Sequence, residues 1–275
     1  MSWFTSAALV FLIAGAVLFL AWRSRQTRPP RVRREPRLRY PIVLAHGAFG
    51  FDQIRVAGRR HVYFRGVPER LRVMGIEVHR PRVPPIGSVV ARAEKLSSAV
   101  RALSAKKVNL IAHSMGGLDA RYAICRLGLA DRVASLTTIG TPHLGTPLAD
   151  LGIGVLRRFR VLFSALLDVD VFVDLTSESL LSFNREMHDA PQVAYASVVA
   201  RGEGAVMNPL LWPSHIYLSE CAGANDGIVP AASQRWGEVI REIVADHWAQ
   251  VGWSSSFDAP ALYEDLAQEL RARGF

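Results

Sequence analysis

From residue 40 onward, short apolar runs rich in valine, isoleucine and leucine alternate with longer segments in which apolar positions recur every three or four residues. The short runs predict strands at 41–45, 76–79, 107–112, 133–139, 193–199 and 216–219. The longer segments predict helices at 68–74, 88–103 and 115–127, and a further helix before residue 246. This alternation is typical of an α/β fold with a mostly parallel central sheet and helices on both faces.

Residues 150–190 interrupt the alternation. Their apolar clusters are too long for a loop between neighbouring strands, so we expect an inserted helical cap, or lid, within the domain of residues 40–275. The apolar side chains of this insertion either lie buried in the core or form a mobile, lipid-facing surface. The sequence leaves both alternatives open.

The amino-terminal segment has a different composition. No charged residue occurs in the twenty positions from Trp3 to Trp22, and a helix of that length spans the hydrocarbon core of a bilayer, about 30 Å. We therefore expect residues 1–22 to form a single-pass transmembrane anchor. A cleaved signal peptide is the alternative; the absence of Lys or Arg ahead of the run, the length of the run and the lack of a clear cleavage site disfavour it.

Residues 23–39 hold eight arginines, one glutamate and three prolines, which predicts an extended basic linker able to lie on anionic headgroups. Because these arginines follow the apolar span, the positive-inside rule places residues 40–275 in the cytoplasm. If residues 1–22 instead act as a signal peptide, the domain is secreted or periplasmic.

The net charge of +9 is concentrated in the linker, which leaves a charge of only +2 on residues 40–275. A nearly neutral body without a basic stripe excludes nucleic acid as the expected partner. The two cysteines, Cys125 and Cys221, are too few for a disulfide framework and lack metal-ligand spacing, so we expect two separate buried thiols. Protein partners cannot be inferred from the sequence.

Candidate chemistry begins at Ser114, in the run LIAHSMGG at the junction of a predicted strand and a predicted helix. A sharp turn there strains the backbone of the serine and holds its hydroxyl clear of the sheet, at the positive end of the helix. Small residues are required two positions before and after it, because strand and helix approach closely. These are Ala112 and Gly116, and Ala112 replaces the usual glycine.

A serine hydroxyl needs a base to take its proton and an acid to orient that base. The acid is expected after a later strand and the base in a loop beyond it, which predicts Asp226 in an Asn-Asp-Gly turn and His247 in an Asp-His-Trp run. The negative oxygen formed during acyl transfer needs N–H donors. We expect the amides of Met115, directly after the serine, and of Ala48, in a Gly-rich loop, to form this oxyanion hole.

With these residues in place, the chain resembles the bacterial triacylglycerol lipases of the α/β-hydrolase fold, the group of the Pseudomonas and Burkholderia lipases. The matching segments are YPIVLAHGAFGFD (40–52), KVNLIAHSMGGLDARY (107–122), VASLTTIGTPHLGTP (133–147), NDGIV (225–229) and DHWAQVG (246–252). The resemblance implies a Ser114, Asp226 and His247 triad with Ala48 and Met115 at the oxyanion hole. Many of these lipases hold calcium through a carboxylate two residues after the catalytic histidine; Ala249 occupies that place here, and we expect no metal and no cofactor.

The sequence therefore predicts a membrane-anchored serine hydrolase that cleaves carboxylic esters of acyl lipids through an acyl-enzyme. A phospholipase, thioesterase or acyltransferase with the same triad is an alternative within the enzyme class. A hydrolase-like scaffold that binds lipid without turnover is the alternative from another class.

Overall fold

The computed structural model describes residues 38–50, 53–56, 59–158, 170–204 and 207–275. The predicted anchor at 1–22 and all but the last two positions of the predicted linker lie outside these ranges. Within the described ranges, no helix is both long and apolar enough to cross a membrane. The contacts of residues 36–275 group them as one compact unit.

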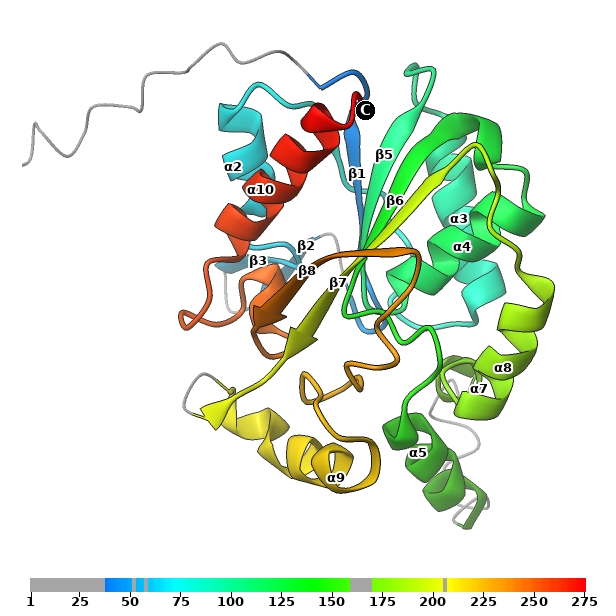
Figure 1. Ribbon diagram of the computed structural model, residues 1–275, viewed down its shortest axis with the longest axis vertical. Coiled ribbons are helices and arrows are strands. Elements are labelled where there is room, and N and C mark those ends of the chain that lie inside the picture. The colour runs from blue at the N-terminus through cyan, green and yellow to red at the C-terminus, as the bar shows by residue number, and fades with distance from the viewer. Residues whose placement is uncertain (1–37, 51–52, 57–58, 159–169, 205–206) are drawn as a thin grey trace, which may run out of the picture. The chain divides into compact units, whose positions relative to one another are not determined.

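A six-stranded sheet forms the centre of this unit, with strand order β4-β1-β5-β6-β7-β8 and every neighbouring pair parallel (Figure 1). Its strands are β1 (Ile42–Ala45), β4 (Val78–His79), β5 (Val108–His113), β6 (Val133–Ile139), β7 (Ala194–Arg201) and β8 (Glu238–Val244). A separate antiparallel hairpin pairs β2 (Gln53–Val56) with β3 (Arg59–Val62). The predicted α/β architecture with a parallel sheet is confirmed.

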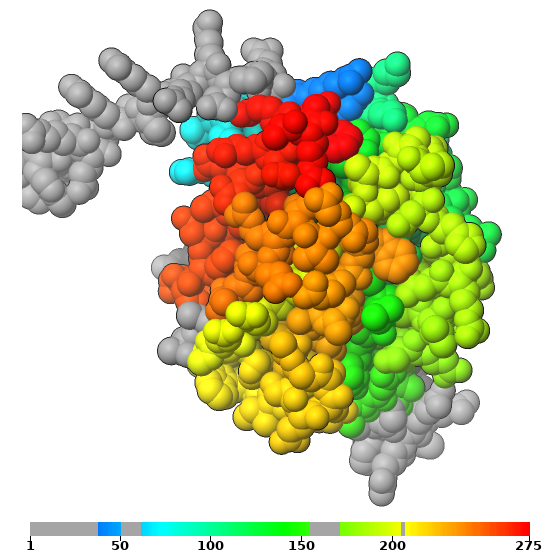
Figure 2. All heavy atoms as spheres, viewed as in Figure 1, coloured from blue at the N-terminus to red at the C-terminus, as the bar shows by residue number. Residues whose placement is uncertain are grey.

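Helices cover both faces of the sheet because its central strands are apolar on both sides. In β1, Ile42 and Leu44 belong to the core formed with α2 (Val67–Val73) and α10 (Ala259–Ala272). The alternate residues of that strand face the opposite core, formed with α3 (Val89–Arg101) and α4 (Gly116–Arg126). Figure 1 shows these pairs on opposite sides of the sheet, and Figure 2 shows α10, in red, on the surface of its side.

The described part of 150–190 is helical, as predicted. It contains α5 (Pro147–Arg158), α7 (Asp170–Asp174) and α8 (Ser177–Glu186). Its apolar side chains are divided between the core and the surface: Val171 and Leu180 pack in a core cluster with Met115 of the serine turn, whereas Leu151 and Leu181 are about half exposed. A mobile, lipid-facing surface stays a prediction.

Two predicted elements are wrong. Residues 216–219 were expected to form a strand, but they lie in helix α9 (Trp212–Ala222), which begins with Pro213 in its first turn and ends at Gly223 with φ +77°. The segment before residue 246 was expected to be helical, but it forms the edge strand β8. This segment pairs with β7, and its residues Ile240 and Ile243 pack against the core from the edge of the sheet. Tertiary pairing therefore overrides the helix-like spacing of its apolar residues.

The cysteines are free and separate, as predicted, but they are not buried. Cys125 of α4 is half-buried, and Cys221 is exposed in the last turn of α9 rather than at the end of a strand.

Candidate functional site

The turn between β5 and α4 holds Ser114 in the left-handed backbone region, with φ +56°. A non-glycine residue in this region costs about 1–3 kcal/mol and persists only where its surroundings fix it. The Ser114 N–H donates to the Ile139 carbonyl at 2.9 Å, and the Ser114 carbonyl accepts from Thr141 Oγ1 at 2.8 Å and from the Gly117 N–H at 3.0 Å. Ile139, at the end of β6, and Thr141, two positions further, therefore hold both the N–H and the carbonyl of the strained serine.

The small residues around the serine have the packing role predicted for them. A Cβ atom at Gly116 would lie 2.7 Å from the carbonyl oxygen of Ala45 and 2.8 Å from that of His46, which are backbone atoms and cannot swing away. Ala112, at the position where glycine is usual, is completely buried in β5 without disturbing the ladder to its neighbours. Only the glycine after the serine is required by a close backbone approach.

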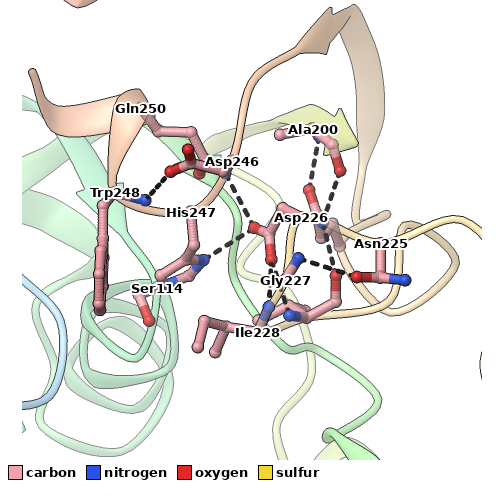
Figure 3. A network of polar contacts seen from close by, with 12 residues as sticks. Ser114, Ala200, Asn225, Asp226, Gly227, Ile228, Asp246, His247, Trp248 and Gln250 are labelled. Atoms are coloured by element: carbon pink, nitrogen blue, oxygen red, sulfur yellow. Dashed lines mark hydrogen bonds and ion pairs between the residues drawn. The ribbon is translucent and has the colours of Figure 1, made fainter. Parts of the chain in front are cut away.

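The structure brings Asp226 and His247 together although 21 positions separate them. His247 Nδ1 donates to Asp226 Oδ2 at 2.7 Å, and the His247 N–H donates to the Asp226 carbonyl at 2.8 Å (Figure 3). Asp226 is fully buried, and its Oδ1 accepts from the amides of Ile228 and Val229 at 3.0 and 2.7 Å. These donors fix the carboxylate as an acceptor aimed at the imidazole.

Ser114 lies at the same edge of the sheet as this pair. The ring of His113, the residue before the serine, lies 4.6 Å from the ring of His247 between centroids. Figure 3 draws the Ser114 side chain beside the His247 ring, on the side away from Asp226. The three residues predicted to act together therefore lie together at the carboxyl end of the sheet.

The loop after β1 and the start of α4 supply the two amides expected to bind an oxyanion. In that loop the Gly47 N–H donates to Tyr63 Oη at 3.3 Å, the Phe49 N–H to the Pro85 carbonyl at 2.6 Å and the Gly50 N–H to the Gly47 carbonyl at 3.2 Å. Among the described residues, the amides of Ala48 and Met115 have no acceptor. These two N–H groups, at the positions predicted from the sequence, remain available to a ligand.

Gly47 makes the closest approach of this loop to the nucleophile. A Cβ atom at this position would lie 2.6 Å from Ser114 Cβ and 3.0 Å from Ser114 Oγ. We therefore expect Gly47→Ala to displace the serine hydroxyl and to lower kcat for a soluble p-nitrophenyl ester about a hundredfold, with a much smaller change in KM. Steady-state kinetics measure this, and Gly152→Ala in α5 is the control for adding a methyl group, because its new Cβ would make only an ordinary contact, 3.5 Å from the Phe172 ring. Unchanged kcat in Gly47→Ala would contradict the close approach.

A buried arginine holds the same loop in place. Arg92 of α3 is fully buried, and its NH2 donates to the His46 carbonyl at 2.8 Å while its NH1 donates to the Pro84 carbonyl. Its charge is paired with Asp119 of α4 at 2.8 Å. Burial raises the pKa of Asp119 to about 7, and the adjacent guanidinium opposes that rise. Arg92 thus joins α3, α4 and the loop that carries Ala48.

Several polar partners of the site could not be predicted from the sequence. Tyr63 follows β3 and contacts His113, and Gln250 contacts Asp226; both were unremarkable in the sequence because their partners lie 50 and 24 positions away. Asp246, next to the imidazole, accepts from the amides of Trp248 and Ala249 at 2.9 and 2.8 Å. In the described part of the chain, no group of three or more His, Cys, Asp or Glu side chains could hold a metal ion.

Known proteins resemble the chain in sequence and in fold. A family model described as alpha/beta hydrolase fold matches residues 84–188. The chain is 33% identical over 283 residues to a triacylglycerol lipase of Vibrio cholerae, covering 86% of this chain and 89% of that protein. It is 32% identical over 207 residues to triacylglycerol lipase 2 of Saccharomyces cerevisiae, covering 70% of this chain but only 63% of the yeast protein. The crystal structure of a metagenomic carboxyl esterase matches with a TM-score of 0.73 and 21% identity, covering 90% of this chain and 81% of that one.

Proposed function

Because the chain belongs to the bacterial lipases of the α/β-hydrolase superfamily, we propose that it cleaves carboxylic esters of acyl lipids through an acyl-enzyme formed on Ser114. The chain is a carboxylic ester hydrolase. The observation that carries the mechanism is the 2.7 Å contact between Asp226 and His247 at the edge of the sheet where Ser114 leaves β5.

In this mechanism Ser114 Oγ attacks the ester carbonyl while His247 takes its proton through Nε2. Asp226 keeps the Nδ1–H of that imidazole oriented and stabilises the imidazolium that forms. The amides of Ala48 and Met115 donate to the oxyanion. The imidazolium then protonates the departing alcohol, and a water molecule, deprotonated by the same histidine, releases the acid and restores the serine.

Apolar side chains at this edge of the sheet support an acyl-lipid substrate. Phe49 lies next to Ala48 in the loop after β1, here called the oxyanion loop, Leu144 follows β6 and Trp248 follows the base, and each is at least a third exposed. Helix α9, which packs against α5, adds Trp212 and Ile216, about half exposed. Such a group of exposed large apolar residues around a site favours a substrate with hydrocarbon chains.

Two assays test this function on the full chain. A fluorophosphonate probe is expected to label Ser114, as located by mass spectrometry of the labelled peptide. A panel of triacylglycerols, phospholipids, acyl thioesters and p-nitrophenyl esters is expected to show turnover of carboxylic esters. Preference for phospholipids or thioesters would assign one of the alternative activities. Absence of both labelling and turnover would favour the non-catalytic scaffold.

We also propose that residues 1–22 tether the enzyme to a membrane, with the hydrolase domain in the cytoplasm. The linker joins the domain just before β1, at the edge of the sheet opposite the carboxyl ends where Ser114 lies. A proline-containing linker of 17 residues (23–39) reaches about 50 Å at roughly 3.1 Å per residue. A domain of this size is about 45 Å across, so the linker is long enough for the catalytic edge to turn toward the bilayer that anchors it.

Membrane fractionation tests this tether. The full chain is expected to stay with membranes after washes with high salt and with alkaline carbonate, whereas a chain beginning at Arg37 is expected in the soluble fraction. Release of the full chain by salt alone would contradict the anchor. A reporter fused after Phe275 that is active only outside the cytoplasm would reverse the orientation.

A further inference from the structure

A fully buried glutamine, Gln250, contacts the proposed acid but has no role in the mechanism above. It lies three positions after His247, in the short helix η4 (Ala249–Val251). Its Nε2 donates to Asp226 Oδ2 at 2.8 Å, the same oxygen that accepts from His247 Nδ1 (Figure 3). Its Oε1 lies 3.2 Å from Nε2 of His113, the residue before the nucleophile.

The direction of each hydrogen bond in this cluster follows from the partners. His113 Nε2 also lies 3.1 Å from the His247 carbonyl, which can only accept, so Nε2 carries a proton. Burial, helped by the nearby His247, holds the pKa of His113 well below its usual range, so the ring is neutral and Nδ1 is an acceptor. Tyr63 Oη, 2.7 Å away, therefore donates to Nδ1. The side-chain oxygen of Gln250 is left to accept from His113, and its amino group to donate to the carboxylate.

The hydrogen bonds form one continuous series across the site. It runs from the Gly47 N–H to Tyr63, then to His113, Gln250 and Asp226. The series thus joins the loop beside the oxyanion donor, the strand that carries the nucleophile and the acid. These parts belong to segments that are up to about 200 positions apart in the sequence. Pairing of β1 with β5 already joins the loop to the nucleophile strand, and the series adds the acid to them.

Gln250 has no room to leave this position. Gly140, at the end of β6 with φ +57°, faces its Oε1, and a Cβ atom there would overlap that oxygen and lie 3.2 Å from Asp226 Oδ2. A side chain packed this closely keeps a single rotamer, so its amide holds the carboxylate in one orientation.

We propose that Gln250 is a positioning residue for the hydrolytic reaction, which fixes Asp226 Oδ2 and ties it, through His113 and Tyr63, to the nucleophile turn and the oxyanion loop. This role rests on the proposed function of Ser114, Asp226 and His247. Gln250 touches neither substrate nor the reacting atoms; it acts through the acid. Its amide also withdraws part of the negative charge from Oδ2, and this limits how strongly the carboxylate stabilises an imidazolium at His247.

The test is Gln250→Met in the full chain, which keeps the volume and removes both hydrogen bonds. With p-nitrophenyl butyrate, kcat is expected to fall about tenfold to a hundredfold with KM within about twofold, because the acid is less well oriented. Since Oδ2 loses a donor, the imidazolium of His247 is better stabilised, and the acidic limb of the kcat/KM–pH profile is expected to move upward by about half a pH unit or more.

Gln234→Met is the matched control. Gln234 is equally buried and also makes hydrogen bonds at both ends of its amide, but to backbone groups of Ala200 and Val229 rather than to the triad. Gln234→Met is expected to lower the melting temperature without moving the acidic limb of the kcat/KM–pH profile. Tyr63→Phe removes the donor to His113 with little change in packing, and a fall in kcat of several-fold is expected, with the acidic limb moving in the same direction.

The outcomes separate the two proposals. Wild-type activity and an unmoved acidic limb in folded Gln250→Met, or an equal effect in Gln234→Met, would overturn the positioning role alone. If Gln250→Met does not fold, wild-type kinetics in Tyr63→Phe would overturn it instead. A wild-type protein that neither hydrolyses the ester nor reacts with a fluorophosphonate would overturn the proposed function together with this role.

Discussion

Replacing Ser114 with alanine is expected to lower kcat for soluble p-nitrophenyl esters by about a millionfold and to abolish fluorophosphonate labelling. The reason is that no other hydroxyl occupies the turn between β5 and α4, where the backbone donors of Met115 and Ala48 converge with His247. Without the nucleophile, only the oxyanion donors and binding remain, and these give a small residual acceleration over water. Labelling and single-turnover kinetics on the purified chain measure the loss.

The strained backbone at Ser114 provides a control for folding. Alanine keeps a Cβ atom at φ +56°, so Ser114→Ala is expected to retain the strain and to melt close to the wild-type temperature. Ser114→Gly removes the strain and is expected to be more stable than Ser114→Ala by about 1 kcal/mol, while being equally inactive. Residual activity in both variants well above the uncatalysed rate would show that another residue is the nucleophile.

The central strands could be predicted because burial on both faces leaves a direct mark on the sequence. Strands β1, β5 and β6 are continuous apolar or β-branched runs bounded by turn residues, and their observed bounds agree with the prediction within one or two residues. The amphipathic helix α3 could be predicted equally well. Its predicted start at Ser88 is the observed N-cap, where Ser88 Oγ accepts from the Ala91 N–H.

The errors occur where tertiary contacts outweigh local pattern. In α9 the alternation of Ile216 and Leu218 with their neighbours resembles a strand. Only Leu218 of this helix is buried, so its apolar residues do not form the continuous buried face by which a helix is recognised in a sequence. In β8 the spacing of Val239, Ile240 and Ile243 resembles a helix, and only pairing with β7 makes it a strand. Local propensity cannot anticipate such pairing.

The candidate triad could be named without either element being right. Asp226 was expected after a strand at 216–219, but it follows helix α9 and lies in a turn bridged by Asn225 and Pro230. The residue was identifiable because the order of the motifs along the chain, and the Asn-Asp-Gly turn itself, do not depend on the element before them. Gln250 and Tyr63 were not identifiable, because a lone polar residue has no periodicity or spacing to reveal a partner that only the fold brings near.

Asp226→Asn is expected to lower kcat by about ten-thousandfold. The protein is expected to fold with a lower melting temperature, because the new amino group at the Oδ2 position also faces the donating Nε2 of Gln250. Asparagine keeps the shape of the side chain, and its oxygen can still accept at the Oδ1 position from the amides of Ile228 and Val229. The amino group then faces His247 Nδ1 and donates to it, so the imidazole holds its proton on Nε2, the nitrogen that must accept from Ser114. The base is present but in the wrong tautomer, and only a rare alternative state is active.

Asp246→Asn is the comparison that makes this result specific. Asp246 is as deeply buried and as well supplied with backbone donors as Asp226, with the Asn208 N–H donating to its Oδ2 at 2.9 Å, but its carboxylate bonds no imidazole of the described residues. Its replacement is therefore expected to reduce the melting temperature and to change kcat by less than about tenfold, because it stabilises the loop and not the tautomer. Added hydroxide distinguishes the two further: activity of Asp226→Asn is expected to rise steeply at alkaline pH, where hydroxide replaces the missing base. Equal losses in the two variants would mean that Asp226 acts only through the conformation of its loop, and the acid of the reaction would have to be sought elsewhere.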